Sequence, residues 1–325
     1  MVVVKAAVYY ENGGPDVLRY ADVPDPEIGP GEVLLRIEAV GVQGGDLLHR
    51  QSAPPETTPH VVGYQAAGTV AAVGEGVTGL REGQRAVAFM PHGSHAELAA
   101  VPEHNAYRVP DDLDPRLAAG IPVEFGTADD CLFEFGRLRA GEVVLVQAAA
   151  GGVGLAAVQL AAAAGATVLG TASSAEKLAR LGEHGLHHAI NYREEDVAAR
   201  VAELTDGRGV DLVVDPVGGR TLESSVAALA YRGRISWVGQ AGREPNPPRL
   251  DPLMFKSASL NGVYFGGEMA HDPARTRALI ERLIARVAAG ELTVVVDREF
   301  PLAEAAEAHR HIEGRGAFGR VLLIP

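Results

Sequence analysis

Residues 142–154 read EVVLVQAAAGGVG, a short apolar run that passes directly into a glycine-rich turn. The run is typical of a buried parallel strand, and the alanine-rich residues after it are typical of a helix. Glycines at such a turn let the chain bend sharply and let its backbone approach a pyrophosphate, which the N–H groups of the helix start can bind. In this strand–turn–helix context the string predicts a dinucleotide site, with a purely structural turn as the alternative. The expected contacts are Gly151, Gly152, Val153 and Gly154.

Downstream of this loop, strand-like and helix-like segments alternate. Strands are expected at 167–171, 189–191, 210–215 and 233–239, with helices at 174–182, 196–205 and 222–229 between them. This alternation predicts an α/β fold in which a parallel, doubly wound sheet carries helices on both faces.

The chain upstream of the loop has a different residue pattern. Short valine-rich runs at 2–10, 32–42, 68–73, 85–89 and 97–101 are separated by Gly/Pro clusters, which predicts a β-rich, barrel-like domain. After residue 262 a helix (274–289), a strand (294–299), a helix (303–313) and a strand (319–324) are expected. We therefore expect three parts, 1–119, 120–261 and 262–325.

Composition and charge narrow the functional classes. A chain of 325 residues exceeds one ordinary core, and its 47% hydrophobic and 22% charged residues are normal for a folded enzyme. The net charge of −13 and the lack of a long Lys/Arg run argue against nucleic-acid binding. The one cysteine, Cys131, is expected to be a core residue.

Nothing in the chain predicts export or membrane insertion. The first ten residues are strand-like and lack the pattern of a signal peptide. The uncharged stretch 154–172 is about as long as a membrane span, but a glycine loop opens it and alanine dominates it, so a helix followed by a buried strand fits better. We expect a cytoplasmic protein.

The end of the strand after the loop decides which dinucleotide is preferred. An NAD site usually places Asp or Glu there to bind the ribose 2′-hydroxyl. This chain reads GTASS at 170–174, with Lys177 one turn further on. Ser173, Ser174 and Lys177 can bind a 2′-phosphate, which predicts NADPH; a helix N-cap at Ser173 and a solvated Lys177 are the alternatives.

Over nearly its whole length the chain resembles the zinc-independent quinone oxidoreductase (zeta-crystallin-like) branch of the medium-chain dehydrogenases/reductases. The resemblance implies a GroES-like first domain, a Rossmann domain and a C-terminal segment that returns to the first. It also implies NADPH as cofactor and hydride transfer to quinones or other α,β-unsaturated carbonyl compounds. The motifs that carry it are ENGGPDVL (11–18), PGEV (30–33), GTV (68–70), GEVVLV (141–146), the glycine loop and AINYREED (189–196).

The resemblance also assigns cofactor residues by position. It implies that Tyr192 lies with Ser173 and Lys177 at the adenosine phosphate end, with a loop-packing role for Tyr192 as the alternative. Further residues it places along the cofactor are Val217, Gly239, Gln240, Phe265 near the nicotinamide, Thr127 near its ribose, and Arg315, whose alternative is a solvated charge.

Zinc ligands of the related dehydrogenases are missing. Their ligand cysteine and Gly-His-Glu correspond here to Gln43 and to the run Gly63, Tyr64, Gln65. Tetrahedral zinc needs three or four N, S or O ligands, so no metal is expected. His92 and His95 have H-x-x-H spacing but lack a third ligand nearby.

At the substrate end the chain departs from the family pattern. Residues 41–48 read GVQGGDLL where relatives carry an asparagine and aromatics, and residues 123–130 are acidic. Tyr64, Gln43 and Thr127 are the candidate polar donors to an acceptor oxygen. Two other functions compete: a zinc-free alcohol dehydrogenase, and a non-catalytic NADPH-binding protein of structural or RNA-binding kind.

Residues 257–265 read SASLNGVYF and have the content of one more strand after the Rossmann series. An open sheet edge can pair with a second copy around a two-fold axis, which predicts a homodimer. Relatives in this branch commonly dimerise through this region. The alternative is an internal strand covered by the C-terminal helices.

Overall fold

A computed structural model describes residues 3–52 and 54–325, so Val2 of the first predicted strand lies outside the described residues. The chain divides into two compact units, Met1–Val123 with Asp272–Pro325, and Glu124–His271. The chain thus passes between units at 123/124 and 271/272, where the sequence suggested 119/120 and 261/262.

The second unit is built on one parallel sheet. Its strands are β9 (Val143–Val146), β10 (Thr167–Ala172), β11 (His188–Asn191), β12 (Val210–Asp215), β13 (Leu229–Trp237) and β14 (Ser259–Gly262). They are ordered β11-β10-β9-β12-β13-β14, with every neighbouring pair parallel. The central strands are almost fully buried, as expected for a sheet with helices on both faces.

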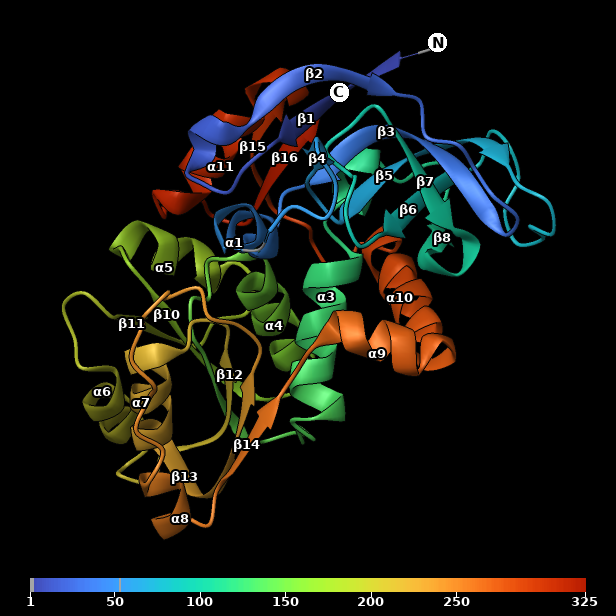
Figure 1. Ribbon diagram of the computed structural model, residues 1–325. Coiled ribbons are helices and arrows are strands. Elements are labelled where there is room, and N and C mark those ends of the chain that lie inside the picture. Colours follow the sequence, from blue (N-terminus) through green and yellow to red (C-terminus); the bar gives the residue numbers. More distant parts are fainter. Residues whose placement is uncertain (1–2, 53) are drawn as a thin grey trace. The chain divides into compact units, whose positions relative to one another are not determined.

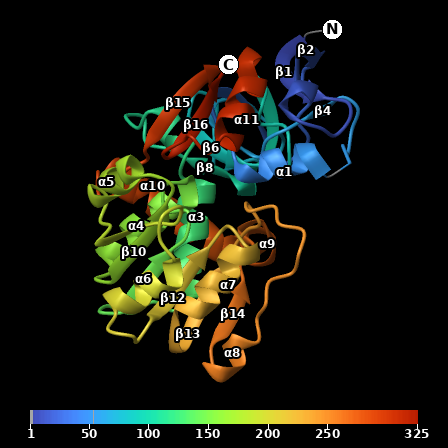
Figure 2. The ribbon, with the colours of Figure 1, turned by 90° about the vertical axis from the view of Figure 1, so that its left-hand side faces the viewer.

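Helices connect these strands and confirm the predicted doubly wound α/β arrangement (Figure 1). One group lies with β9, β10 and β11. Another pair packs together, its first helix contacting β11 and its second contacting β12 and β13 (Figure 2). The first group is α4 (Gly152–Ala163) and α5 (Ala175–Gly182); the pair is α6 (Val197–Leu204) and α7 (Gly219–Ala228). The remaining elements are α8 (Pro252–Phe255), α9 (Phe265–His271), and α3 (Pro122–Asp129), which continues into a π-helical turn, Asp130–Glu134.

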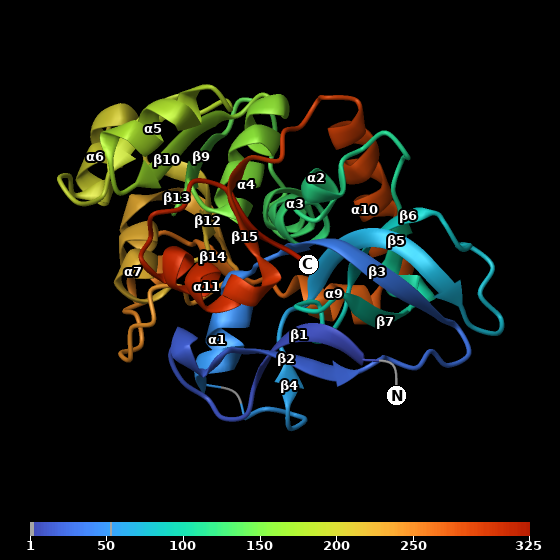
Figure 3. The same cartoon turned by 90° about the horizontal axis from the view of Figure 1, so that it is seen from above.

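The first unit is β-rich, as predicted. A three-stranded sheet is ordered β2-β1-β4, where β1 is Val3–Tyr9, β2 Arg19–Pro24 and β4 His60–Val61 (Figure 3). A seven-stranded sheet is ordered β15-β16-β3-β5-β6-β8, with β7 also pairing β3. Its strands are β3 (Glu32–Gly41), β5 (Gln65–Val73), β6 (Arg85–Phe89), β7 (Leu98–Pro102), β8 (Ala106–Arg108), β15 (Val296–Pro301) and β16 (Arg320–Ile324).

Helices complete this unit around an aliphatic core contributed by both ends of the chain. They are α1 (Gly44–Ser52), α2 (Pro115–Ala118), α10 (Pro273–Ala288) and α11 (Ala305–Glu313). Among the described residues no helix is both long and apolar enough to cross a membrane.

One predicted strand is shorter than expected. Residues 257–265 were expected to form a single strand, but β14 ends at Gly262 and Phe265 is the first residue of α9. Phe265, one of the aromatic residues that suggested a strand here, is instead a buried residue of this helix, while Tyr264 before it is exposed.

Candidate functional site

The glycine loop has the geometry of a phosphate cradle. Ala148 adopts a left-handed backbone (φ 49°), which turns the chain from β9 toward α4. A Cβ at Gly154 would overlap the carbonyl oxygen of Ala148, so only glycine fits where the helix meets the loop. Gly151 is the N-cap of α4 and supplies no side-chain cap, and Gly151 is also exposed. The N–H groups that open α4 can therefore serve an anionic ligand, which fits a dinucleotide pyrophosphate.

A series of four side-chain hydrogen bonds, running from the loop to Asp215, holds this loop in place. The Ala148 N–H donates to Thr171 Oγ1 (3.1 Å), whose hydroxyl donates to Gln147 Oε1 (2.9 Å). Gln147 Nε2 donates to Ser225 Oγ (3.1 Å), and Ser225 donates to Asp215 Oδ2 (2.8 Å). This series of hydrogen bonds joins the carboxyl ends of β9, β10 and β12, so these strand ends hold the loop in place. Sequence patterns did not reveal it, because its members are far apart in the chain.

Asp215 is the acceptor at the end of that series. Its other oxygen accepts the N–H groups of Val217 (2.8 Å) and Gly218 (2.9 Å). Burial raises the pKa of Asp215, while these bonds and the one from Ser225 act in the opposite direction. These bonds hold Val217 just after β12; its place along the cofactor, which the resemblance implies, stays a prediction.

The predicted adenosine-phosphate residues gather at the ends of β10 and β11. Ala172 ends β10 beside Asn191, and the Tyr192 N–H donates to the Ala172 carbonyl (3.3 Å). Ser173 and Ser174 follow directly, and Lys177 lies in the first turn of α5. No carboxylate follows β10 before Ser174, which fits a 2′-phosphate. Tyr192 is 39% exposed, so its ring is accessible to a ligand.

The N-cap of α5 is Ser174, not Ser173. Ser174 Oγ accepts the Lys177 N–H (3.4 Å), which shifts the cap by one residue because β10 extends to Ala172. Ser173 thus has no capping role. The exposed Arg193, directly after Tyr192, adds a cation at this end that sequence reasoning overlooked.

The predicted nicotinamide-side residues of the second unit lie on two packed helices. Thr127 and Gly126 belong to α3, and a Cβ at Gly126 would overlap the Phe265 ring. Phe265 is 4% exposed and Thr127 is 5% exposed, so both side chains are almost completely enclosed by their neighbours.

Gly239 and Gln240 follow β13 and lie beside the turn after β12. The Gly239 carbonyl accepts Trp237 Nε1–H (2.7 Å), and a Cβ at Gly239 would come within 2.7 Å of the Pro216 oxygen. Gln240 is exposed. Both residues therefore lie at the carboxyl edge of the sheet, near Val217.

Two of the candidate polar donors come together in the first unit. The Gln43 N–H donates to Asp46 Oδ2 (2.8 Å) at the start of α1, and Gln43 is 4% exposed. A Cβ at Gly45 would lie 2.6 Å from the Tyr64 hydroxyl oxygen, so the glycine leaves room for that ring. Tyr64 also packs edge-on against Phe89. Tyr64 and Gln43 thus flank one helix start.

Arg315 belongs to the first unit, directly after α11. It is exposed and has a left-handed backbone (φ 56°). Its role as a cofactor residue stays a prediction.

His92 and His95 contact different partners. His92 is near Glu56 (3.6 Å), and its ring lies tilted against that of the buried His60, whose pKa is lowered to about 4 chiefly by burial. His95 is fully buried and its Nε2 lies 3.2 Å from His309 Nε2. Across residues 3–52 and 54–325, no three His, Cys, Asp or Glu side chains are grouped to hold a metal ion.

The imidazole pair belongs to a larger buried network. Arg50, fully buried in α1, donates to His309 Nδ1 (2.9 Å) and pairs with Glu313 Oε1 (2.5 Å) on α11. Because an arginine can only donate, His309 must carry its proton on Nε2 and donate it to His95 Nε2. Both imidazoles are therefore neutral in the folded chain. Burial lowers the pKa of His95 to about 3 and that of His309 well below its ordinary value.

Cys131 lies in the core of the second unit, as expected. It is fully buried, and burial raises the pKa of its thiol, so it is not a reactive nucleophile.

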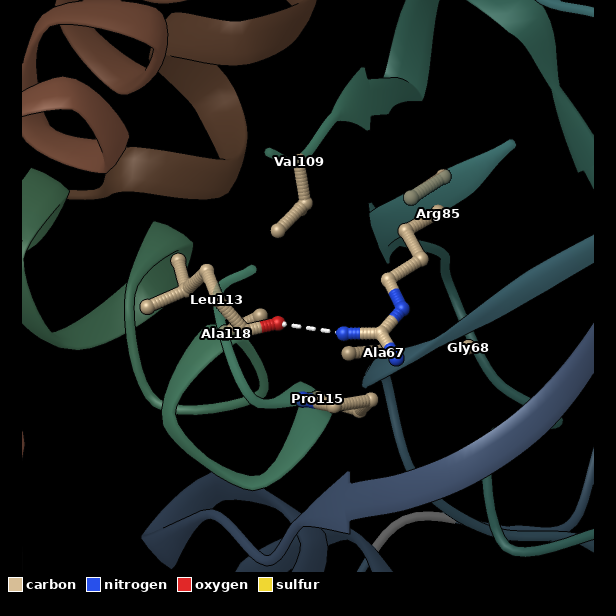
Figure 4. A pocket seen from close by; sticks show the side chains of 8 residues that line it. Ala67, Gly68, Arg85, Val109, Leu113, Pro115 and Ala118 are labelled. Carbon is tan, nitrogen blue, oxygen red and sulfur yellow. Dashed lines mark hydrogen bonds between the residues drawn. The ribbon is translucent and has the colours of Figure 1, made fainter. Parts of the chain in front are cut away.

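A small hollow in the first unit offers no chemistry for catalysis (Figure 4). Its one charged side chain, Arg85, already donates a hydrogen bond to the Leu113 carbonyl oxygen (3.0 Å). The hollow is lined by Ala67, Gly68, Arg85, Ala86, Val109, Leu113, Pro115 and Ala118.

Comparison with known proteins finds two family matches along the chain. Residues 29–111 match the alcohol dehydrogenase GroES-like domain, and residues 152–285 match the zinc-binding dehydrogenase family. A quinone oxidoreductase of Pseudomonas aeruginosa is 36% identical over 96% of this chain and 97% of its own length. A 2-haloacrylate reductase of a Burkholderia species is 36% identical, covering 99% of each chain. The structure of Escherichia coli quinone oxidoreductase complexed with NADPH has a TM-score of 0.94 and 30% identity, covering 99% of this chain and 100% of that one.

Proposed function

Because the chain belongs to the quinone oxidoreductase branch of the medium-chain dehydrogenase/reductase superfamily, we propose that it is an NADPH-dependent reductase of quinones or other α,β-unsaturated carbonyl compounds. The relatives include quinone oxidoreductases and a 2-haloacrylate reductase, whose substrates share a carbon–carbon double bond conjugated to a carbonyl group. We further propose that it works without zinc, since Gln43, Tyr64 and Gln65 occupy the positions of the zinc-ligand pattern.

The phosphate cradle carries this proposal. The start of α4 is free of side-chain caps, Gly154 admits close contact with the loop, and Thr171 holds the loop from below. At the adenosine end, Ser173 and Lys177 can bind a 2′-phosphate that an acidic residue would repel.

The chain's own residues orient the reactants and stabilise charge. Bound NADPH supplies the hydride from its nicotinamide ring. Thr127 and Phe265 define one tight surface for that ring. Hydride addition places negative charge on the acceptor oxygen, which the Tyr64 hydroxyl and the Gln43 amide can stabilise by hydrogen bonding. A proton completes the reduced product, and Tyr64 can pass it from water.

The test follows NADPH absorbance with separate panels of quinones, enones, 2-haloacrylates and simple ketones. We expect turnover with at least one conjugated acceptor, and NADPH to bind more tightly than NADH. Binding without any turnover would instead support a non-catalytic NADPH-binding protein. Turnover restricted to simple ketones or alcohols would support an alcohol dehydrogenase.

A homodimer through β14 is also proposed. This strand pairs only β13 and ends the sheet, so one edge of β14 is open within the described sheet. Large apolar side chains are exposed on the neighbouring elements: Tyr231 on β13 (68%), Met254 (72%) and Phe255 (77%) on α8 before β14, and Tyr264 (77%) after it. An isologous contact along β14 could bury such side chains.

Light scattering after size exclusion tests the dimer. The expected mass is twice the 34.0 kDa of one chain, and replacing both Met254 and Phe255 by Glu should return it to 34.0 kDa without unfolding. A wild-type mass of 34.0 kDa at micromolar concentration would reject the dimer.

We place the protein in the cytoplasm, where NADPH is available.

A further inference from the structure

The buried side chain of Gln65 joins two helix ends in the first unit. Gln65 opens β5 opposite Phe89 and is 0% exposed. Its Nε2 donates to the carbonyl oxygen of Ala119, the C-cap of α2. Its Oε1 accepts the N–H of Val123 (2.7 Å), the second residue of α3. One amide thus satisfies a backbone acceptor at the end of one helix and a backbone donor at the start of the next.

Both backbone groups lack a partner within their own helices. The last carbonyl groups and the first N–H groups of any helix need an outside partner, and a buried one without it is costly. The surroundings leave no room for a substitute, because Ala119 and Ile121 are fully buried. A Cβ at Gly41 would overlap the Ala119 oxygen, so β3 packs directly against this contact.

An amide fits this position and a carboxylate does not. Gln65 presents a donor and an acceptor, each facing its complement. An ionised glutamate could accept from Val123 but would place negative charge against the Ala119 carbonyl. A protonated glutamate would regain the donor. This difference supplies the test.

The helix that Gln65 fixes carries a proposed site residue. The chain passes from the first unit to the second between Val123 and Glu124, inside α3. Thr127 follows one turn later, beside the contact of Gly126 with Phe265.

We propose that Gln65 is a positioning residue: its amide clamps the start of α3 and thereby holds Thr127 in place for hydride transfer. The inference rests on the proposed reductase function for its kinetic consequence, but not for the clamp itself. The two can be tested separately.

The clamp is tested by hydrogen exchange on the cofactor-free protein. Gln65→Met keeps the shape and removes both hydrogen bonds, and Gln65→Glu keeps only the acceptor when ionised. Backbone amides over residues 123–127 should exchange about tenfold faster in Gln65→Met, the effect of losing one buried hydrogen bond. Gln84→Glu is the matched control, because Gln84 Oε1 only accepts, from the Arg81 N–H (3.0 Å).

The positioning role is tested by separating turnover from binding. In both Gln65 variants kcat should fall about tenfold while the Kd for NADPH, bound by the glycine loop, changes less than about twofold. In Gln65→Glu the loss should lessen as the pH is lowered and the new carboxyl is protonated, a recovery absent from Gln65→Met.

Each outcome decides something different. Unchanged exchange over residues 123–127 in Gln65→Met overturns the clamp. Faster exchange with an unchanged kcat leaves a structural clamp and overturns the positioning role. A wild-type protein that reduces no conjugated acceptor contradicts the proposed function, and exchange alone then decides whether the clamp exists.

Discussion

The neutral pair His95 and His309 makes the protein sensitive to acid. Arg50 faces His309, and His309 donates to His95, so a proton added to either ring breaks the chain of donors and acceptors. In the unfolded chain both imidazoles ionise with an ordinary pKa of about 6.5. Unfolding at low pH therefore takes up protons that the folded state excludes.

The direction and size of the effect follow from linkage. A base whose pKa is lowered by folding gives full stability above about pH 6.5 and loses it as the pH falls toward the folded value, about 3 for His95. At pH 5 the unfolded state gains about 2 kcal/mol from His95, and His309, whose pKa burial also lowers, adds to this in the same direction. That is a large part of an ordinary unfolding free energy of about 5–15 kcal/mol.

Urea unfolding measured between pH 8 and pH 5 provides the assay. His309→Gln should be less stable than wild type at pH 8, and the difference between their unfolding free energies should become smaller at pH 5, because the variant has lost one of the two groups that take up a proton on unfolding. His104→Gln, at an exposed position, is the control: its unfolding free energy should differ from that of wild type by the same amount at pH 8 and at pH 5. Parallel curves for wild type and His309→Gln would refute the assignment of a neutral, buried imidazole.

Other predictions concern the cofactor site. Lys177→Ala should raise the Kd for NADPH by about 10–100-fold, the loss of a charge-assisted bond, and leave NADH binding unchanged in fluorescence titrations; an equal loss for both cofactors would contradict the 2′-phosphate contact. Gly154→Ala should lower the melting temperature and abolish measurable NADPH binding, because the added Cβ overlaps the Ala148 oxygen; a normal Kd would argue against the cradle. Thr171→Val should destabilise the fold by about 1–3 kcal/mol in urea titrations, more than Thr171→Ser does. Prolonged chelation should leave activity unchanged, whereas one zinc per chain lost together with activity would overturn the zinc-free proposal.

The elements around the glycine loop could be predicted because their signals are local. The apolar run 143–146, the turn and the alanine-rich helix each follow from neighbouring residues, and the β-α alternation continues them. The strand, the turn and the helix that follow one another here could therefore be predicted from the sequence, while the binding role of Gly151 and Gly154 stays a prediction.

Elements held by tertiary contacts could not be predicted in this way. Helix α1 opens on two glycines and is polar overall, and its buried Arg50 gives no local helical signal; partners on α11 fix it instead. The Gln65 contact is similar, since nothing near residue 65 indicates that residues 119 and 123 approach it. Phe265 was expected in a strand because its aromatic ring suits one, and its burial against α3 decided otherwise.

The return of the C-terminal segment has a consequence for synthesis on the ribosome. Strand β16 lies between β15 and β3, and it pairs with β3 at Gly41 and Val40. Until residues 320–324 leave the exit tunnel, β3 keeps an open edge and Arg50 lacks Glu313. Residues 124–271, by contrast, are complete well before translation ends. The first unit can thus be completed only after the second has been synthesised, and a chain that stops before residue 320 would expose an incomplete β-sheet.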